Sequence, residues 1–458
     1  MLSIPQALAR IKGNLPAFLP EATLHRLCRD LQLSYRNRRL TPVVTAHLFL
    51  RQILEGNKPV PELQRITKFP FSCSAYCEAR QRLPVAFCQR LHHAALGHCR
   101  PYAEHDRDAL WRGRHRAFFL DGSSFSMPDT PELQDEFGQP GGQAPGCGFP
   151  TAHLLVQFDA HHGYLHRIIP SPLRTHDMAH AAFLHKDLRP GDIVGGDRAF
   201  CSYAHLALLH QRGLFGLFRA HQRQIISFRP RRRHAGPGRA KPGQAGLPRS
   251  RWLKRLGRDD QLVEYVKPVE CPDWMDPKDY AALPATLVVR ELRVPVRTPG
   301  CRVRVLTLVT TLLNPRLYPK RAVARLFALR WGVEVNLKHL KQTLGLDVLR
   351  CETRKGVWKE LLMFVVVYNL VRRVMTEAAR RQRVLPHRIS FVDALRWLRE
   401  ARRGEALPPL RVNPARPGRF EPRAKKRRPK PFDLMNQPRA VLREALLHQT
   451  SPPKEDTT

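Results

Sequence analysis

The spacing of apolar residues changes along the chain, and each change separates regions of different predicted structure. Over roughly the first 108 residues, apolar positions recur every three or four residues, at 23–33, 41–54 and 83–96. This spacing predicts amphipathic helices, and the Pro and Gly residues between the segments are typical of the turns that separate helices. We therefore expect an N-terminal helical region, in which 71–84 could form a helix–turn unit lying on a DNA backbone; a plain helical bundle is the alternative.

From about residue 116 the chain alternates short apolar runs with helical segments. One apolar run ends in Asp121, a hairpin pattern covers 151–170, and a second apolar run ends in Asp197. A turn follows each aspartate, and an acid at the carboxyl end of a buried strand lies at the rim of a sheet, where ligands bind. The order of hairpin, helix, strand and helix favours an α/β fold with a ribonuclease-H-like catalytic core.

Residues 220–305 interrupt this alternation. Their first half is dense in Arg, Lys, Gly and Pro, and their second half contains β-branched runs with strand-like alternation. We interpret the segment as an inserted antiparallel β domain with basic loops. The alternative is a disordered basic spacer, and the alternation argues against it for the second half. A long, largely apolar helix is expected next, at 357–381.

The segment 320–345 predicts a helix that carries a single carboxylate, Glu334. Its expected apolar stripe consists of Leu326, Leu329, Val333, Leu337, Leu340 and Leu344. The flank of that stripe holds Phe327, Arg330, Glu334, Lys338 and Lys341 within roughly 80° of one another, at about 100° of rotation per residue. Glu334 could simply pair with Arg330 and Lys338 one turn away. It could instead meet acids from elsewhere in the fold, and the helix alone does not decide between these readings.

The composition indicates a class of binding partner. The chain has 458 residues and a formal net charge of +39, from 78 Lys and Arg against 39 Asp and Glu. Such self-repulsion favours a polyanionic partner, nucleic acid before membrane. A GC-rich genome would explain some of the Arg but not the scarcity of acids. The basic, Pro-rich C-terminal region is interpreted as an arm that neutralises phosphates, with a solvated charge run as the alternative.

The length predicts several domains. We expect an N-terminal helical DNA-binding domain (1–110), the first part of the catalytic core (111–219), the inserted β domain (220–305), the second part of the core (306–380) and a basic C-terminal region (381–458). The first residues lack the features of a signal peptide, and no apolar run is long enough to cross a membrane, so a cytoplasmic protein is expected.

The cysteines predict reduced thiols rather than a disulfide framework. Cys73, Cys77, Cys88, His92 and Cys99 lie in the helical region. A zinc site there is disfavoured, because the spacing is loose and no second tight pair completes it.

The acids suggest a metal centre. Asp121 and Asp197, together with the downstream Glu334, would form a hard oxygen site for Mg²⁺ or Mn²⁺ if the fold brought them together. Two such ions activate a nucleophile and stabilise the leaving oxygen of a phosphoryl displacement. Arg330, Lys338 and Lys341 would then serve as phosphate contacts.

These residues resemble the signature of the insertion-sequence type 4 transposases, the DDE transposases that carry a Tyr-Arg-Glu-Lys motif. Phe327, Arg330, Glu334 and Lys341 have the spacing of that motif, with Phe in place of Tyr. The resemblance places Asp121 and Asp197 as the first and second catalytic aspartates. It puts in doubt the phosphate contact that the Tyr hydroxyl makes in the family, whereas the packing of the ring can remain.

The resemblance implies a bacterial enzyme that uses two Mg²⁺ ions, with Mn²⁺ as a substitute. It would bind the terminal inverted repeats of its own element as a homodimer on paired ends, cut through a hairpin intermediate and join target DNA. Trp252 or Trp274 of the insert could stack on a flipped base, although a buried Trp is the commoner explanation.

Three other functions remain open at this point. The chain could be an inactive or repurposed transposase that only binds DNA, or a nuclease or resolvase that cuts without joining. A His-dependent hydrolase is suggested by His153, His161, His162, His166, His176 and His180. This last reading is disfavoured, because no Ser or Cys in a nucleophile elbow accompanies them.

Overall fold

The computed structural model describes residues 19–36, 38–67, 69–104, 110–175, 178–232, 247–296, 305–402, 404–414 and 435–450. Three features of interest from the sequence lie outside the described residues: the basic stretch at 233–246, most of the basic C-terminal arm at 415–434, and His176.

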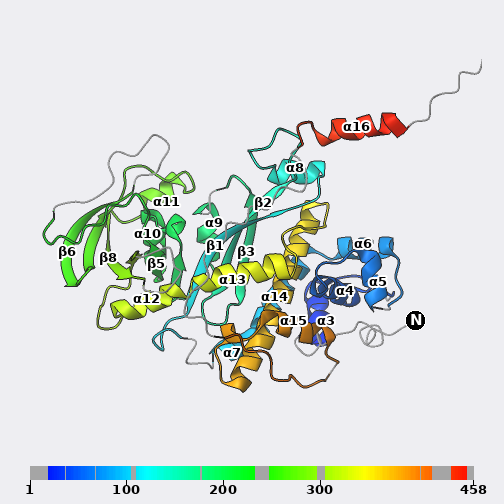
Figure 1. Cartoon of the computed structure of the whole chain (residues 1–458), viewed down its shortest axis with the longest axis horizontal. Helices are drawn as coiled ribbons and strands as arrows, with labels where there is room; N and C mark the ends of the chain where they lie inside the picture. The colour runs from blue at the N-terminus through cyan, green and yellow to red at the C-terminus, as the bar shows by residue number, and fades with distance from the viewer. Residues whose placement is uncertain are drawn as a thin grey trace, which may run out of the picture.

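One nine-stranded sheet runs through the described part of the chain (Figure 1). Its strands are β1 (Ala117–Ser126), β2 (Thr151–Asp159), β3 (Leu165–Pro172), β4 (Ile193–Gly196), β5 (Phe215–Arg219), β6 (Arg249–Gly257), β7 (Asp260–Val266), β8 (Thr286–Pro295) and β9 (Val305–Thr310). Their order across the sheet is β3-β2-β1-β4-β5-β9-β8-β7-β6. β4 and β5 pair in parallel with β1 and β4, respectively, whereas β2 is antiparallel to both of its neighbours.

Three strands of the predicted insert, β6 to β8, extend this sheet together with β9, which begins where the predicted insert ends. β6 to β9 are antiparallel, and β9 pairs directly with β5 through Leu217 to Arg219. The antiparallel strands expected in the second half of the insert are therefore present. They share a continuous hydrogen-bonded ladder with the strands that carry the two aspartates.

Successive side chains of a strand point to opposite faces of the sheet, and two buried clusters follow this alternation. Phe119, Ile193 and Leu217 belong to the larger cluster. Their neighbours on the same strands, such as Leu120 and Val194, belong to the smaller one. The central strands are thus buried on both faces, which explains why they are almost continuously apolar in sequence.

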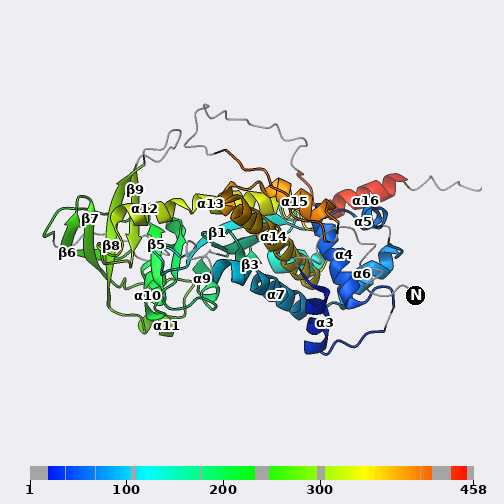
Figure 2. The ribbon, with the colours of Figure 1, turned by 90° about the horizontal axis from the view of Figure 1, so that it is seen from below.

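Helices cover both faces (Figure 2). α9 (Met178–Leu184), α10 (Tyr203–Gln211) and α11 (Pro277–Ala281) lie on the face of the smaller cluster. The other face is covered by α12 (Lys320–Ala328), α13 (Trp331–Lys338), the π-helical turn η3 (His339–Thr343) and α14 (Arg354–Gln382). The short 3-10 helix η2 (Arg198–Phe200) follows β4.

The N-terminal helices join the same hydrophobic core. They are α3 (Glu21–Asp30), α4 (Pro42–Leu54), α5 (Val60–Thr67), α6 (Cys73–Arg82) and α7 (Val85–Glu104), with α8 (Pro131–Phe137) further along the chain. Residues such as Leu50 and Phe87 share one buried cluster with Phe119 and with Phe364 of α14. Lys359 of α14 also donates hydrogen bonds to the carbonyl groups of Arg80, Gln81 and Leu83 at the end of α6. α14 therefore links the helical region to the sheet, and the division into domains stays a prediction.

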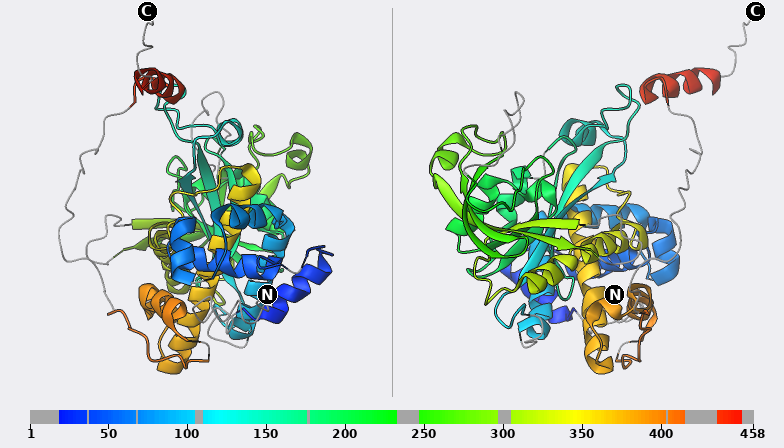
Figure 3. Two further views of the ribbon diagram at one scale, coloured as in Figure 1. Left: turned by 90° about the vertical axis from the view of Figure 1, so that its right-hand side faces the viewer. Right: turned by 60° about the vertical axis from the view of Figure 1, so that its left-hand side comes forward.

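The C-terminal part contains more structure than a basic arm. The 3-10 helix η4 (Pro386–Arg388) and α15 (Phe391–Glu400) add Phe391 and Leu398 to the larger cluster. α16 (Arg439–Thr450) extends from the body beside α8 (Figure 3). Arg439 anchors it, because its guanidinium lies 3.2 Å from the Asp129 carboxylate and stacks on the Phe149 ring.

No helix in the described part of the chain combines the length and the apolar character that a bilayer crossing requires.

Candidate active site

The two aspartates lie side by side because of the parallel register of β1 and β4. Phe118 of β1 is level with Val194, and Phe119 is level with Gly195. Two further residues along the same register bring Asp121 level with Asp197. Neighbouring strands are about 4.8 Å apart, so the backbones that carry the two acids run close together at the point where β4 ends.

Asp121 does not end its strand, which corrects the expectation from the sequence. β1 continues to Ser126, and Gly122 to Ser126 pair with β2. The polar, turn-like sequence after Asp121 is held as a strand by this pairing alone as far as Phe125, and Ser126 also bridges Val348. Asp121 therefore lies at the point where β1 passes beyond β4 and its other edge becomes open, whereas Asp197 directly follows β4 as expected.

Both aspartates belong to the sheet face that α12 and α13 cover. Asp121 is two residues from Phe119, and Asp197 is four residues from Ile193, both of which pack in the larger cluster. Because successive side chains of a strand alternate between the two faces of the sheet, both acids point to this same face. Asp197 also caps η2, because its carboxylate accepts a hydrogen bond of 2.7 Å from the N–H of Arg198.

The electrostatics of Asp121 place the third acid nearby. Burial raises the pKa of Asp121 to about 6, and the carboxylates of Glu334 and Asp197 add to the rise. A hydrogen bond from the N–H of Gly122 and the positive charge of Arg330 act in the opposite direction. The charges of Asp197, Glu334 and Arg330, which are far from Asp121 in sequence, thus act on Asp121 across the same face of the sheet.

Glu334 is carried by α13, which crosses the sheet beside β1 (Figure 1). Phe327 at the end of α12 fixes this position, since its ring meets that of Phe119 edge-on with centroids 6.4 Å apart. Gly195 makes room for Phe119, because a Cβ at that position would overlap the ring. The Glu334 side chain is 61% exposed and accepts a hydrogen bond of 3.0 Å from Arg330.

The single helix predicted at 320–345 consists of three helical pieces, and this corrects the positions of the side chains around the helix that were expected from the sequence. Between Leu326 and Val333 the backbone makes i→i+3 hydrogen bonds, which turn the chain by about 120° per residue instead of about 100°. Leu329 is consequently 41% exposed and does not belong to the apolar stripe. The other predicted stripe residues, including Leu337 and Leu340, are buried.

The predicted DNA contacts differ in their surroundings. Phe327 is 5% exposed, so it packs in the core, and Arg330 is largely covered beside Glu334. Lys338 is exposed on α13. Lys341 lies in the π-helical turn, with its ammonium 3.1 Å from the carboxylate of Asp347.

The family follows from comparison with known proteins. Residues 112–370, more than half of the chain, match the family model described as the transposase DDE domain. The chain belongs to the DDE transposase family. It is 22% identical over 387 residues to the transposase InsG for insertion sequence element IS4 of Escherichia coli strain K12, a match that covers 82% of this chain and 79% of the relative. The insertion-sequence type 4 family inferred from the sequence is thereby confirmed.

A solved structure of the piggyBac transposase, a synaptic complex with hairpin DNA, also resembles this transposase. The two share 11% sequence identity and a TM-score of 0.40, over 86% of this chain and 80% of that one.

The acids of this transposase fit a divalent ion by their chemistry. Carboxylate oxygens are the ligands that Mg²⁺ and Mn²⁺ prefer, and an ion would relieve the repulsion that contributes to the raised pKa of Asp121. Among the described residues, however, no three His, Cys, Asp or Glu side chains lie close enough together to hold one ion. Glu334 is instead paired with Arg330, so a shared ion would require its carboxylate to leave that partner.

Arg219 is a further candidate site residue that was not predicted from the sequence. The β4–β5 register pairs Gly196 with Phe218, so Arg219 is level with Asp197. Burial and the neighbouring Arg198 lower the pKa of the Arg219 guanidinium, whereas Asp197 raises it, and Arg330 also acts on it. The transposase therefore presents Asp121, Asp197 and Arg219 abreast on three parallel strands. The signal in the sequence was a basic residue at the end of the next apolar run after the one that ends in Asp197.

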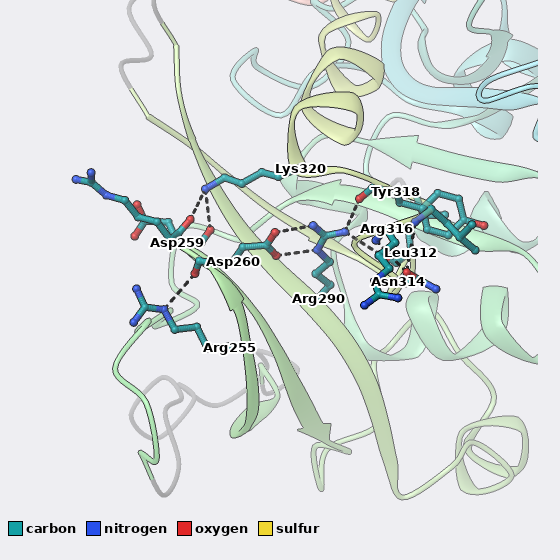
Figure 4. A network of polar contacts seen from close by, with 12 residues as sticks. Arg255, Asp259, Asp260, Arg290, Leu312, Asn314, Arg316, Tyr318 and Lys320 are labelled. Carbon is teal, nitrogen blue, oxygen red and sulfur yellow. Dashed lines mark hydrogen bonds and ion pairs between the residues drawn. The ribbon is translucent and has the colours of Figure 1, made fainter.

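A buried network joins the insert strands to the start of α12 (Figure 4). Arg290 of β8 is fully buried, binds the Asp260 carboxylate with two N–H groups at 2.7 and 2.5 Å, and donates to the carbonyl of Tyr318 at 2.7 Å. Lys320, the first residue of α12, donates to two carbonyl groups in the β6–β7 turn at 2.7 and 3.1 Å. β8 and the β6–β7 turn thus fix the start of the helical segment that carries Glu334.

Several other His, Trp and Cys residues singled out in the sequence make structural contacts in the fold. His162 is fully buried, and its N–H bonds to the Asp159 carboxylate while its carbonyl accepts from Arg372. Trp252 lies half-buried on the edge strand β6, and Trp274 packs against the smaller cluster. In the helical region, burial raises the pKa of the Cys88 and Cys99 thiols to about 12. That shift disfavours the thiolate form that binds zinc.

Proposed function

We propose that this transposase cuts and joins DNA at the terminal inverted repeats of its own insertion sequence, with Asp121, Asp197 and Glu334 as catalytic and metal-binding residues. The observation that carries the proposal is the strand register that brings Asp121 level with Asp197, together with the charge of Glu334 that acts on Asp121 at the open edge of β1. The sheet order β3-β2-β1-β4-β5, in which β2 alone is antiparallel, supports a ribonuclease-H-like core.

The proposed chemistry is an in-line phosphoryl transfer. Two divalent ions, Mg²⁺ or in its place Mn²⁺, would supply activation of the attacking oxygen and neutralisation of the leaving one. The transposase must keep Asp121 and Asp197 deprotonated and turned to the same side. The Glu334 carboxylate must leave Arg330 and turn toward Asp121 and Asp197. Its exposure of 61% allows the change of rotamer without breaking packing.

The surrounding cations are proposed to hold the DNA strand. Arg330, freed from Glu334, would present a planar donor pair to a phosphate. Lys338 and Lys341 would continue along the strand from the same helical segment. Phe327 has no hydroxyl to offer, so it is proposed to act by positioning α12 against Phe119 rather than through a polar contact.

The family resemblance is the basis for the remaining proposals. They are cleavage through a hairpin, joining to target DNA, and a homodimer on paired ends at the bacterial nucleoid in the cytoplasm. The net charge of +39 suits such a substrate, because each phosphate neutralised by Lys or Arg releases counterions. The helical region 1–110 and the basic C-terminal region 381–458 are the proposed sites of additional DNA contacts.

The test is strand cleavage of a labelled duplex carrying the inverted repeat that flanks the reading frame. Wild-type protein with Mg²⁺ is expected to cut at the end of the repeat. Glu334→Ala is expected to lower the cleavage rate by at least roughly a thousandfold, because one carboxylate of a two-metal site is lost. Its affinity for the duplex should remain within about threefold of wild type.

The matched control is Glu264→Ala in β7, an acid of the same length that pairs with Arg251 on the insert strands. It should cut at close to the wild-type rate. Near-normal cutting by Glu334→Ala would refute the assignment of the third acid. Binding by the wild type without any cut, in Mg²⁺ and in Mn²⁺, would favour a repurposed DNA-binding protein, and cutting without a joined product would favour a nuclease.

A further inference from the structure

A cavity of about 390 Å³ lies where the helical region meets the end of the segment that carries Glu334. One wall is the turn between α4 and α5, with Gly56 and Asn57. The opposite wall comes from 341–350 and includes Lys341 and Arg350. The two walls touch at their base, since a Cβ on Gly345 would lie 3.5 Å from the carbonyl oxygen of Gly56.

The walls are fixed by hydrogen bonds rather than by loose packing. Asn57 is 2% exposed, and its amide nitrogen donates to the Glu360 carboxylate at 2.6 Å. The same carboxylate accepts from the backbone N–H groups of Arg350 and Cys351 at 2.9 to 3.1 Å. The guanidinium of Arg350 donates through Nε to the carbonyl of Asn57 at 2.5 Å. The cavity is therefore formed before any ligand arrives.

Two cations and one acid line the cavity, and the Glu360 carboxylate is buried behind its walls. Lys341 pairs with Asp347 at 3.1 Å, and both side chains are partly exposed, at 24% and 46%. The Nη groups of Arg350 have no hydrogen-bond or ion-pair partner among the described residues. With the Glu360 carboxylate that bonds to both walls included, the charges balance, and the two Nη groups of Arg350 are left as coplanar donors for a ligand.

We propose that this cavity binds a backbone phosphate of the transposase's own DNA end, with Arg350 and Lys341 as its cations and Asp347 as a competing anion. This inference rests on the proposed function, because it takes DNA as the ligand. Arg350 suits a phosphate, because its fork donates to two oxygens at once. The turn between α4 and α5 and the helical segment that carries Glu334 would then contact the same DNA strand.

A DNA strand that runs along this helical segment would bring a particular phosphate to the cavity. Lys341 follows Glu334 by seven residues, which is about 10 Å at the rise of an α-helix and somewhat less because Lys341 lies in the π-helical turn. The spacing of about 3.4 Å per nucleotide along a DNA strand converts this distance to about three nucleotides. The bound phosphate should therefore lie roughly two to five nucleotides from the scissile one.

Asp347 has a distinct role in this arrangement. It holds Lys341 while DNA is absent, and it repels the incoming phosphate. Asp347→Asn should free Lys341, so the DNA end is expected to bind roughly 3–10-fold more tightly at 0.1 M salt. Arg350→Gln should bind the end roughly 3–10-fold more weakly, and the slope of log affinity against log salt should fall by about 1. Arg350→Lys should restore most of the slope but not all of the affinity.

The experiment is a phosphate-by-phosphate scan. Duplexes carrying the flanking inverted repeat are made with one neutral methylphosphonate at a time, and binding is measured by fluorescence anisotropy. Wild-type cleavage of the unmodified duplex in Mg²⁺ fixes the scissile position in the same preparation. One methylphosphonate near it should weaken wild-type binding by roughly 3–10-fold. The same substitution should leave the already weakened binding of Arg350→Gln unchanged.

Matched controls come from the opposite face of the sheet, where Arg212 at the end of α10 and Asp279 on α11 are both exposed. Arg212→Gln and Asp279→Asn make the same changes of net charge outside the regions proposed to contact DNA. The proposal is overturned if Arg350→Gln loses no more affinity than Arg212→Gln, or if it stays sensitive at every phosphate that matters to the wild type. If Arg350→Gln does not fold, Asp347→Asn decides. An affinity gain no larger than that of Asp279→Asn would then overturn the proposal. Absence of wild-type cleavage would instead count against the proposed function.

Discussion

Replacing Asp121 with Asn should make the metal-free protein more stable at neutral pH. The substitution keeps the shape of the side chain and an oxygen that can accept from the N–H of Gly122. It removes a charge that is partly buried and that lies near two other carboxylates. These are the causes of the raised pKa of Asp121, about 6 against an ordinary value of 3.8.

The sign follows from proton linkage. The folded state holds the Asp121 proton more tightly than the unfolded chain does, so this group stabilises the fold relative to its charged form at low pH. That contribution is complete below about pH 3.8 and is lost as the pH rises through about 6. About two pH units correspond to roughly 3 kcal/mol as an upper limit. In EDTA at pH 8, Asp121→Asn should therefore unfold roughly 2–5 °C above wild type.

Divalent metal should reverse the order. A bound ion stabilises the folded protein in proportion to the logarithm of its concentration over its dissociation constant. Wild-type protein should gain stability in Mn²⁺, and Asp121→Asn should gain much less. Because a ligating carboxylate must be deprotonated, the gain of the wild type should also shrink as the pH falls through about 6.

The assay is thermal unfolding at pH 4.5, 6 and 8, with EDTA or with Mn²⁺. Asp279→Asn on α11, an exposed aspartate, is the control for loss of one negative charge. The reasoning fails if Asp121→Asn is less stable than wild type at pH 8 in EDTA. It also fails if the difference between them is the same at pH 4.5 as at pH 8.

Two further changes test the surroundings of the acids. Arg219→Gln should slow cleavage by roughly tenfold to a hundredfold, because a cation level with Asp197 is lost. Stability should change little, and a normal cleavage rate would exclude Arg219 from the site. Arg290→Met should destabilise the fold by about 3–5 kcal/mol in urea unfolding, because Asp260 is left buried without its partner. The double variant with Asp260→Leu should recover most of that loss, and equal destabilisation in both variants would show that the pair acts through packing alone.

The order of elements in the core could be read from the sequence because its signals are local. The apolar runs that end at Asp121 and Asp197 predicted β1 and β4, and the alternation at 151–170 predicted the β2–β3 hairpin. The extent of β1 could not be read, since Gly and the serines after Asp121 have low β-propensity. Pairing with β2 overrides that propensity.

The helical segment at 320–345 was predicted in place but not in geometry. A sequence pattern assumes a constant rotation per residue, whereas this segment is overwound near Leu329 and underwound at η3. Packing of Phe327 on Phe119 and the anchoring of Lys320 supply the constraints that local propensity lacks. This is why the exposure of Leu329 was mispredicted, although most of the stripe was correct.

Contacts between residues far apart in the chain could not be predicted from a single sequence. That Arg219 is level with Asp197 depends on the β4–β5 register, which no local pattern encodes. The cavity at Lys341 depends on a turn almost 300 residues earlier in the chain, tied by the bond from Arg350 to Asn57. The acids could therefore be predicted from the sequence, whereas tertiary contacts determine which cations accompany them.

The most direct test of the central claim is a structure of the protein bound to a pre-cleaved inverted-repeat end in Mn²⁺, with the ions located by their anomalous scattering. The account predicts manganese between Asp121, Asp197 and Glu334, with the Glu334 carboxylate turned away from Arg330. Manganese bound elsewhere, or bound by the two aspartates while Glu334 keeps its pair with Arg330, would contradict it.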